Sequence, residues 1–148
     1  PWSDADWEEY DERFGQRLEA WLDAGMGSRA LSRPRVREAV ESCLLRFDGE
    51  RLLVHDAVIM PNHVHALVEP LDDNDLSRLL KGIKGTSARE ANKVLGAKGT
   101  FWLDESYDHM VRSNEQYLHF LQYIADNPRN AGLTKSEYWH LRQDLGRP

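Results

Sequence analysis

The spacing of apolar residues along the chain predicts four helices. Apolar positions recur every three or four residues in four stretches, residues 4–24, 34–47, 76–95 and 114–126. Gly25 and Gly96 follow the first and third stretches, and Pro128 follows the fourth, so we expect those helices to end there. In this interpretation the chain opens with a helix, and no strand precedes it.

Three other stretches have the composition of β-strands. Arg51–Met60 and His63–Glu69 are rich in valine, leucine and isoleucine, and Pro61-Asn62 joins them as in a hairpin. Tyr107–Val111 is a third, shorter strand. Because helices are mixed with a small antiparallel sheet and no repeat or linker interrupts them, the pattern predicts a single α+β domain over residues 1–148.

The composition excludes several classes of protein. With 148 residues, 41% hydrophobic and 30% charged, it is that of an ordinary globular domain. No apolar run approaches the roughly 18 residues that span a bilayer, so we expect no membrane partner. A single cysteine, Cys43, excludes an internal disulfide framework and fits a reducing cytoplasm.

The net charge of −6 hides an uneven distribution of charge. Residues 1–27 hold eight acidic residues and two arginines, whereas the remainder is balanced. Residues 78–98 carry six basic residues against one acidic residue: Arg78, Lys81, Lys84, Arg89, Lys93 and Lys98 against Glu90. The first three of these are three residues apart and share one face of a helix. That face either binds phosphates or, as is commoner, is simply solvated.

The segment from Met60 to Val68 contains a His-x-His pair. On a strand, residues two apart share a face, so His63 and His65 point the same way. Two imidazoles side by side can bind one divalent cation. Alone the pattern is weak, and a pair of hydrogen-bonded surface histidines explains it as well.

Tyr123 and Asn127 lie four residues apart on the last predicted helix. At about 100° per residue they are about 40° apart around its axis, so the phenol and the carboxamide face one locus. The same rotation places Tyr117 in the middle of the apolar face, as a core residue, and Tyr123 at its edge. A core tyrosine and an asparagine that ends a helix before Pro128 are the plain alternative.

Together the two segments resemble the REP-associated tyrosine transposases, which are single-tyrosine HUH transposases. The resemblance rests on Met-Pro-Asn-His-Val-His from Met60 and on Tyr-Ile-x-x-Asn-Pro-x-x-Ala-Gly-Leu from Tyr123. Four segments between them also match: Leu79–Lys84, Asn92, Phe101-Trp102 and Tyr107–Arg112. The resemblance covers roughly residues 18–138 and implies the ferredoxin-like HUH endonuclease fold.

The resemblance also implies a role for individual residues. His63 and His65 would ligate Mg²⁺ or Mn²⁺, and Asn127 would complete the metal site. Tyr123 would attack a phosphodiester in single-stranded DNA and form a 5′-phosphotyrosine intermediate. The DNA partner would carry a hairpin of a REP or other palindromic element. Basic residues would contact its backbone: Arg78, Lys81, Lys84 and Arg112.

The sequence departs from this family at both ends. The family's sheet begins with a strand near the N-terminus, where this chain has the helix predicted over residues 4–24. A central sheet position would then be vacant. The Trp-Pro-Trp-Ser-Ser-like segment that ends the family's chains is matched only loosely by Tyr138–His140.

Three classes of function stay open, with a DNA-strand transferase first. The alternatives are a domesticated protein that binds DNA hairpins without cutting them, and an unrelated metal-dependent hydrolase built on the His-x-His pair. His119, one turn before Tyr123, is a candidate general base, although exposed helix histidines are common. We expect a monomer, with the dimer of insertion-sequence relatives as the alternative, located in the cytoplasm on the nucleoid.

Overall fold

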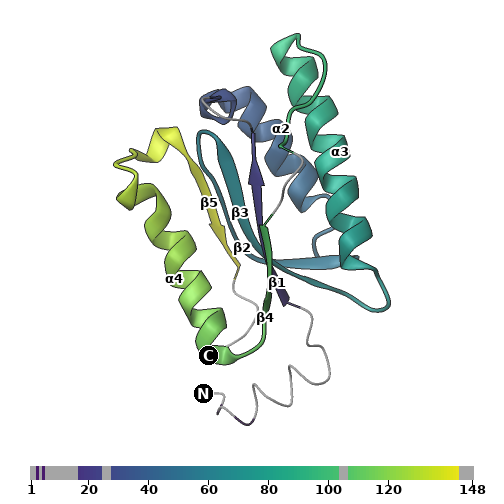
Figure 1. Cartoon of the computed structure of the whole chain (residues 1–148), viewed down its shortest axis with the longest axis vertical. Coiled ribbons are helices and arrows are strands. Elements are labelled where there is room, and N and C mark those ends of the chain that lie inside the picture. Colours follow the sequence, from purple (N-terminus) through teal and green to yellow (C-terminus); the bar gives the residue numbers. More distant parts are fainter. Residues whose placement is uncertain (1–2, 4, 6–16, 25–27, 104–106, 144–148) are drawn as a thin grey trace.

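The described residues form a five-stranded antiparallel sheet with helices on both of its faces (Figure 1). The computed structural model describes residues 3, 5, 17–24, 28–103 and 107–143. The strands are β1 (Arg17–Asp23), β2 (Leu52–Ile59), β3 (His63–Pro70), β4 (Tyr107–Val111) and β5 (Trp139–Arg142). The helices are α2 (Pro34–Leu45), α3 (Leu76–Leu95) and α4 (Asn114–Asn130), with short 3-10 turns η1 (Ala30–Ser32) and η2 (Lys135–Glu137). The α+β class predicted from the sequence is confirmed.

The strand order is β4-β1-β3-β2-β5, so β1 lies inside the sheet. The helix predicted over residues 4–24 is therefore wrong for residues 17–23, and no central position of the sheet is vacant. Residues 4 and 6–16 of that prediction lie outside the described residues. Leu18 and Leu22 are four residues apart, a spacing that puts them on one face of a helix or of a strand alike. Pairing with β3, a distant segment, decides in favour of the strand.

The two faces of the sheet are covered by different helices. In Figure 1, α2 and α3 lie on one side and α4 lies on the other. Under α2 and α3 the sheet is apolar, where Ala20 of β1 and Ala66 and Val68 of β3 pack with Leu44 and Ile83 of the helices. This face supplies most of the hydrophobic driving force for folding.

The face under α4 mixes apolar and charged side chains. Val58 and Leu67 pack there with Ile124 of α4. Six polar or charged side chains of the sheet are also buried: Arg17, Glu19, His55, Asp56, His65 and Glu69. Buried charges are costly unless they are paired, so this layer indicates a structural or functional requirement that apolar residues could not meet.

A β-bulge in β2 contributes two of these side chains. The register with β3 shifts between Val54 and Asp56, which leaves His55 as an extra residue. Successive side chains of a regular strand point to opposite faces, but a bulge breaks that alternation. His55 and Asp56 consequently both make contacts toward the α4 side of the sheet.

Helix α4 continues past the proline that was expected to end it. It reaches Asn130, with Pro128 buried in its last turn. The proline removes only one backbone hydrogen bond, the one that residue 128 would donate to the carbonyl of Ile124. Two residues beyond the end of the helix stands Gly132, whose φ of 69° lies in the left-handed region that favours glycine.

Strand β5 was not predicted from the sequence. It is four residues long, contains no β-branched residue, and pairs with Asp56–Ile59 of β2. None of the helices in the described part of the chain is long and apolar enough to cross a membrane.

We expect Leu67→Ala to lower the free energy of unfolding by about 2–5 kcal/mol, because Leu67 is fully buried between the sheet and α4. The matched control is Leu118→Ala on α4, where the side chain is 54% exposed and the change should stay within about 0.5 kcal/mol. Urea denaturation of both variants measures the difference. Equal losses would contradict the packing described here.

Candidate functional site

Two histidines stand side by side at the start of β3. The ring centroids of His63 and His65 are 5.0 Å apart, as expected for alternate residues of one strand. Trp21 of β1 pairs with His65 across the sheet, and its ring lies 4.3 Å from His65 and 5.2 Å from His63. Trp21 thus forms a wall that keeps both imidazoles in place.

Each imidazole is oriented by a hydrogen bond from Nδ1. His65 Nδ1 is 2.9 Å from a carboxylate oxygen of Glu19, and His63 Nδ1 is 2.7 Å from Asn62 Oδ1. Because both partner oxygens only accept, we assign a proton to Nδ1 of each ring, and in the neutral imidazole the lone pair is then on Nε2. Both Nε2 atoms are buried, and neither has a hydrogen-bond partner among the described residues. Two buried lone pairs without partners mark a place for a Lewis acid or a donor.

His63 is kept neutral by its surroundings. Burial, and then the neighbouring His65, lower the pKa of His63 from 6.5 to about 4, although Asp23 and the side chain of Asn127 oppose the shift. A neutral imidazole at pH 7 keeps its lone pair available for a metal ion.

Helix α4 brings the predicted tyrosine and asparagine to the same place. The ring of Tyr123 lies 5.2 Å from the ring of His65, nearly perpendicular to it, and the side chain is 40% exposed. Asn127 lies near His63 as well, since its side chain is one of the groups that raise the pKa of that histidine. Four residues singled out in the sequence, two on β3 and two on α4, therefore meet at one site.

The donors at this site fit a divalent cation. Among the described residues, no group of three histidine, cysteine, aspartate or glutamate side chains could hold a metal ion, so the set depends on the amide oxygen of Asn127. Two imidazole nitrogens and one carboxamide oxygen suit Mn²⁺ and also accommodate Mg²⁺, which keeps water ligands. The buried Nε2 atoms of His63 and His65 support this fit. The hydrogen bonds of Glu19 and Asn62 would orient the ligands from behind.

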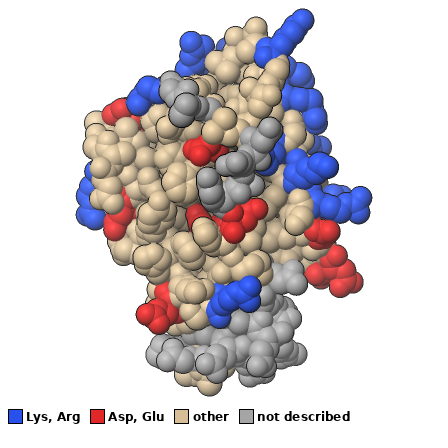
Figure 2. Space-filling model, viewed as in Figure 1, with Lys and Arg blue, Asp and Glu red and all other residues tan. Residues whose placement is uncertain are grey.

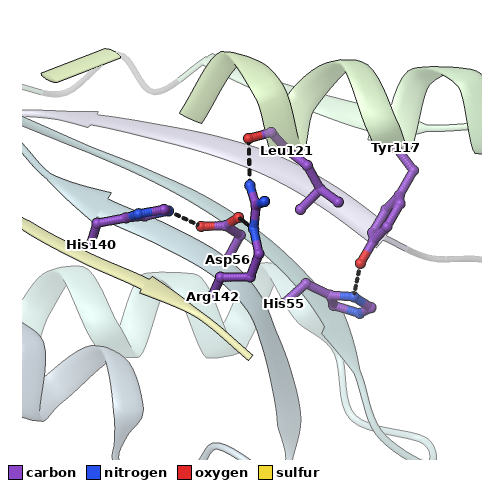
Figure 3. A network of polar contacts seen from close by, with 6 residues as sticks. All are labelled: His55, Asp56, Tyr117, Leu121, His140 and Arg142. Atoms are coloured by element: carbon purple, nitrogen blue, oxygen red, sulfur yellow. Dashed lines mark hydrogen bonds and ion pairs between the residues drawn. The ribbon is translucent and has the colours of Figure 1, made fainter. Parts of the chain in front are cut away.

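A buried chain of polar contacts attaches α4 to the sheet near this site. The hydroxyl of Tyr117 lies 2.8 Å from His55 Nδ1, and His55 Nε2 lies 2.6 Å from a carboxylate oxygen of Glu69 (the Tyr117–His55 contact is drawn in Figure 3). Since the carboxylate accepts, His55 donates a hydrogen bond from Nε2, and its Nδ1 accepts a hydrogen bond from the hydroxyl of Tyr117. The guanidinium of Arg17 also lies 4.5 Å above the Tyr117 ring. Tyr117 is thus a core residue, as its position on the helix predicts.

A second polar contact joins β5 to α4. Asp56 is fully buried and receives hydrogen bonds from His140 at 2.6 Å and from Arg142 Nε at 2.7 Å. The same Arg142 donates through Nη2 to the carbonyl of Leu121 in α4 at 2.8 Å (Figure 3). We call Asp56, Arg142 and the Leu121 carbonyl the α4 clamp. The sequence reasoning missed it, although two adjacent polar residues inside an apolar strand were a visible signal.

The predicted DNA-binding residues lie away from the histidines. Lys81 and Lys84 line a hollow of about 520 Å³ between α3 and residues 99–103, on the α2–α3 side of the sheet; we call it the lysine hollow. Arg78 is exposed on α3 outside this hollow, and Arg112 is exposed between β4 and α4. Basic side chains gather on the α3 side in the space-filling view (Figure 2).

The chain is similar to known proteins in sequence and in fold. The family described as "Transposase IS200 like" matches residues 31–127. The solved structure of a REP-associated tyrosine transposase bound to a REP hairpin is similar, with a TM-score of 0.61 and 23% identity over 82% of this chain and 71% of that chain. A presumed transposase from Deinococcus radiodurans R1 has a TM-score of 0.53 and 19% identity over 75% of this chain and 88% of that chain. No curated protein matches the chain at a significant level.

We expect Tyr117→Phe to destabilise the protein by about 1–3 kcal/mol, because it removes the hydroxyl bonded to the buried His55. Tyr123→Phe is the matched control, since that tyrosine is 40% exposed and should lose less than about 0.5 kcal/mol. Thermal or urea unfolding measures both. A larger loss for Tyr123→Phe would contradict the assignment of these two tyrosines.

Proposed function

The chain belongs to the family of IS200-like transposases, and on that premise we propose that it cuts and rejoins single-stranded DNA through Tyr123. The observation that carries the proposal is the meeting of Tyr123 with two histidines whose buried Nε2 atoms have no hydrogen-bond partner in the described part of the chain. A phenol next to a metal-binding pair has the parts that a phosphodiester transfer needs.

In the proposed reaction the oxygen of Tyr123 attacks the phosphorus of the scissile phosphodiester. The bond from tyrosine oxygen to phosphorus forms, the bond to the 3′ oxygen breaks, and that oxygen takes up a proton to become a free hydroxyl. The DNA 5′ end stays on the enzyme as a phosphotyrosine, which conserves the bond for rejoining. The phenol must lose its proton, and His119 on the same helix is the candidate base.

The other residues position the reacting groups. His63, His65 and Asn127 would hold Mg²⁺ or Mn²⁺, which when bound supplies charge to polarise the phosphate. Glu19 fixes the tautomer of His65. The α4 clamp holds α4 against the sheet and so fixes the position of Tyr123 relative to β3. Because Tyr123 lies beside His65 of its own chain, one copy contains a complete set of reacting residues, which supports a monomer as the active species.

The proposed substrate is single-stranded DNA next to a hairpin, such as a REP element. One similar structure is that of a REP-associated transposase bound to a REP hairpin, which makes this the first substrate to test. Lys81 and Lys84, with Arg78 and Arg112, would contact the phosphates. The two lysines and Tyr123 lie on opposite faces of the sheet, and Asp108 of the end strand β4 lines the same hollow as the lysines. We therefore propose that DNA that touches both passes around the β4 edge.

We expect Tyr123→Phe to bind a hairpin-bearing single strand normally but to form no covalent adduct, because only the attacking hydroxyl is lost. Tyr138→Phe is the matched control and should keep the adduct. The measurement is a denaturing gel with labelled DNA and Mn²⁺, followed by mass spectrometry of the trapped peptide. An adduct on another tyrosine would refute the assignment, and binding without any adduct in the wild type would select the non-cleaving alternative.

We expect His63→Ala and His65→Ala each to lower the rate of adduct formation at least about 100-fold while hairpin affinity changes little, because each removes a proposed metal ligand. EDTA should abolish the reaction of the wild type, and added Mn²⁺ should restore it. Adduct formation that persists in EDTA would sink the metal assignment.

We expect charge removal at Lys81 and Lys84 to weaken binding of all single strands and to reduce the slope of log K against log salt by about one per phosphate contact. The control is Lys135→Gln, which removes an exposed charge far along the chain from the lysine hollow. Fluorescence anisotropy over a range of salt concentrations gives the slopes. An unchanged slope in the double variant would show that Lys81 and Lys84 make no contact with DNA phosphates and are only solvated.

A further inference from the structure

A second hollow lies between β4 and the first turns of α4, and we call it the β4–α4 hollow. Its volume is about 550 Å³, within the range of small-ligand sites. His109 of β4 and His119 and Phe120 of α4 are among the residues that line it. His119 and Phe120 precede Tyr123 by four and three residues, so the hollow begins one helical turn from the proposed nucleophile.

We propose that the β4–α4 hollow binds one unpaired nucleobase of the DNA strand that Tyr123 attacks, an inference that rests on the proposed function. The rings of His109 and Phe120 are nearly parallel, with planes 19° apart and centroids separated by 6.4 Å. Flat aromatic surfaces held parallel beside a hollow suit stacking with a planar base. Proteins bind unpaired bases chiefly by such stacking.

The charges around the hollow favour a base over a phosphate. No lysine or arginine is among the described residues that line it, whereas the carboxylate of Glu115 is. A carboxylate repels phosphate but accepts a hydrogen bond from the amino group of a base. The nearest basic residue along the chain is Arg112, whose backbone N–H donates to the side chain of Gln116, a lining residue, at 2.8 Å. Arg112 is exposed, and we expect its side chain to contact the phosphate of the same nucleotide.

The position of β4 connects this hollow to the lysine hollow. β4 lies at the end of the sheet as described, and its consecutive residues point to opposite faces. Asp108 lines the lysine hollow, and His109 lines the β4–α4 hollow. A DNA strand whose phosphates contact Lys81 and Lys84 therefore has only β4 to cross. Its next bases then reach the β4–α4 hollow.

The test combines protein variants with abasic DNA. Binding is measured by fluorescence anisotropy in the full chain carrying Tyr123→Phe, which removes cleavage from the experiment. The DNA is a hairpin with a single-stranded flank in which each flanking nucleotide is made abasic in turn. We expect abasic substitution at one position to weaken binding about 5- to 150-fold, since one stacked base contributes about 1–3 kcal/mol. His109→Ala should weaken binding of intact DNA by a similar factor.

The decisive result is the combination of the two changes. If the base stacks in the hollow, His109→Ala causes no further loss of affinity for DNA that is abasic at that position. His109→Phe restores the affinity for intact DNA. Phe120→Leu, which keeps an apolar side chain, should behave as His109→Ala does, and Leu118→Ala on the exposed face of α4 should have no effect. Two outcomes would overturn the proposal. In one, the loss of affinity from His109→Ala and the loss from the abasic substitution multiply; in the other, no abasic position weakens binding.

The proposed function is measured separately, as the covalent adduct of Tyr123 in the wild type. An adduct together with hollow variants that bind normally would refute the base site alone. Base-dependent binding in the hollow without any adduct would refute the cleavage reaction alone.

Discussion

The attachment of α4 to the sheet is the contact on which the rest of the site depends. His63 and His65 belong to β3 and Tyr123 belongs to α4. Their relative position is therefore fixed only if α4 is held firmly on the sheet. Apolar packing of Ile124 on Val58 and Leu67 holds the helix against the sheet, and directional contacts fix its position there. The hydroxyl of Tyr117 forms a hydrogen bond with His55. The carbonyl of Leu121 accepts a hydrogen bond from Arg142, which also donates one to Asp56.

Polar contacts serve this purpose better than an apolar layer would. Apolar surfaces tolerate sliding and repacking, whereas a buried hydrogen bond is costly to break without a replacement partner. The β-bulge at His55 makes the arrangement possible, because it turns two consecutive side chains of β2 toward the same helix. A regular strand would have sent Asp56 into the apolar core under α2 and α3.

The sequence predicted the site better than it predicted the sheet. Local periodicity placed His63 and His65 on one strand face and Tyr123 and Asn127 on one helix face, and the family resemblance implied that the two pairs share one site. β1 and β5 were missed because each is defined by pairing with a distant segment, with β3 and with β2 respectively. For the same reason the sequence could not show that Lys81 and Lys84 lie on the other face of the sheet from Tyr123.

The long span of these pairings has a consequence for synthesis of the chain. Asp56 and Arg142 are 86 residues apart, and β1 closes against β4 only once Val111 has been made. Such a topology has a high contact order, and its sheet cannot close until β4 and β5 have been synthesised. On the ribosome the histidine pair emerges long before the helix that carries Tyr123. An unfinished chain that lacks α4 therefore carries the histidine pair without the tyrosine that we propose as the nucleophile.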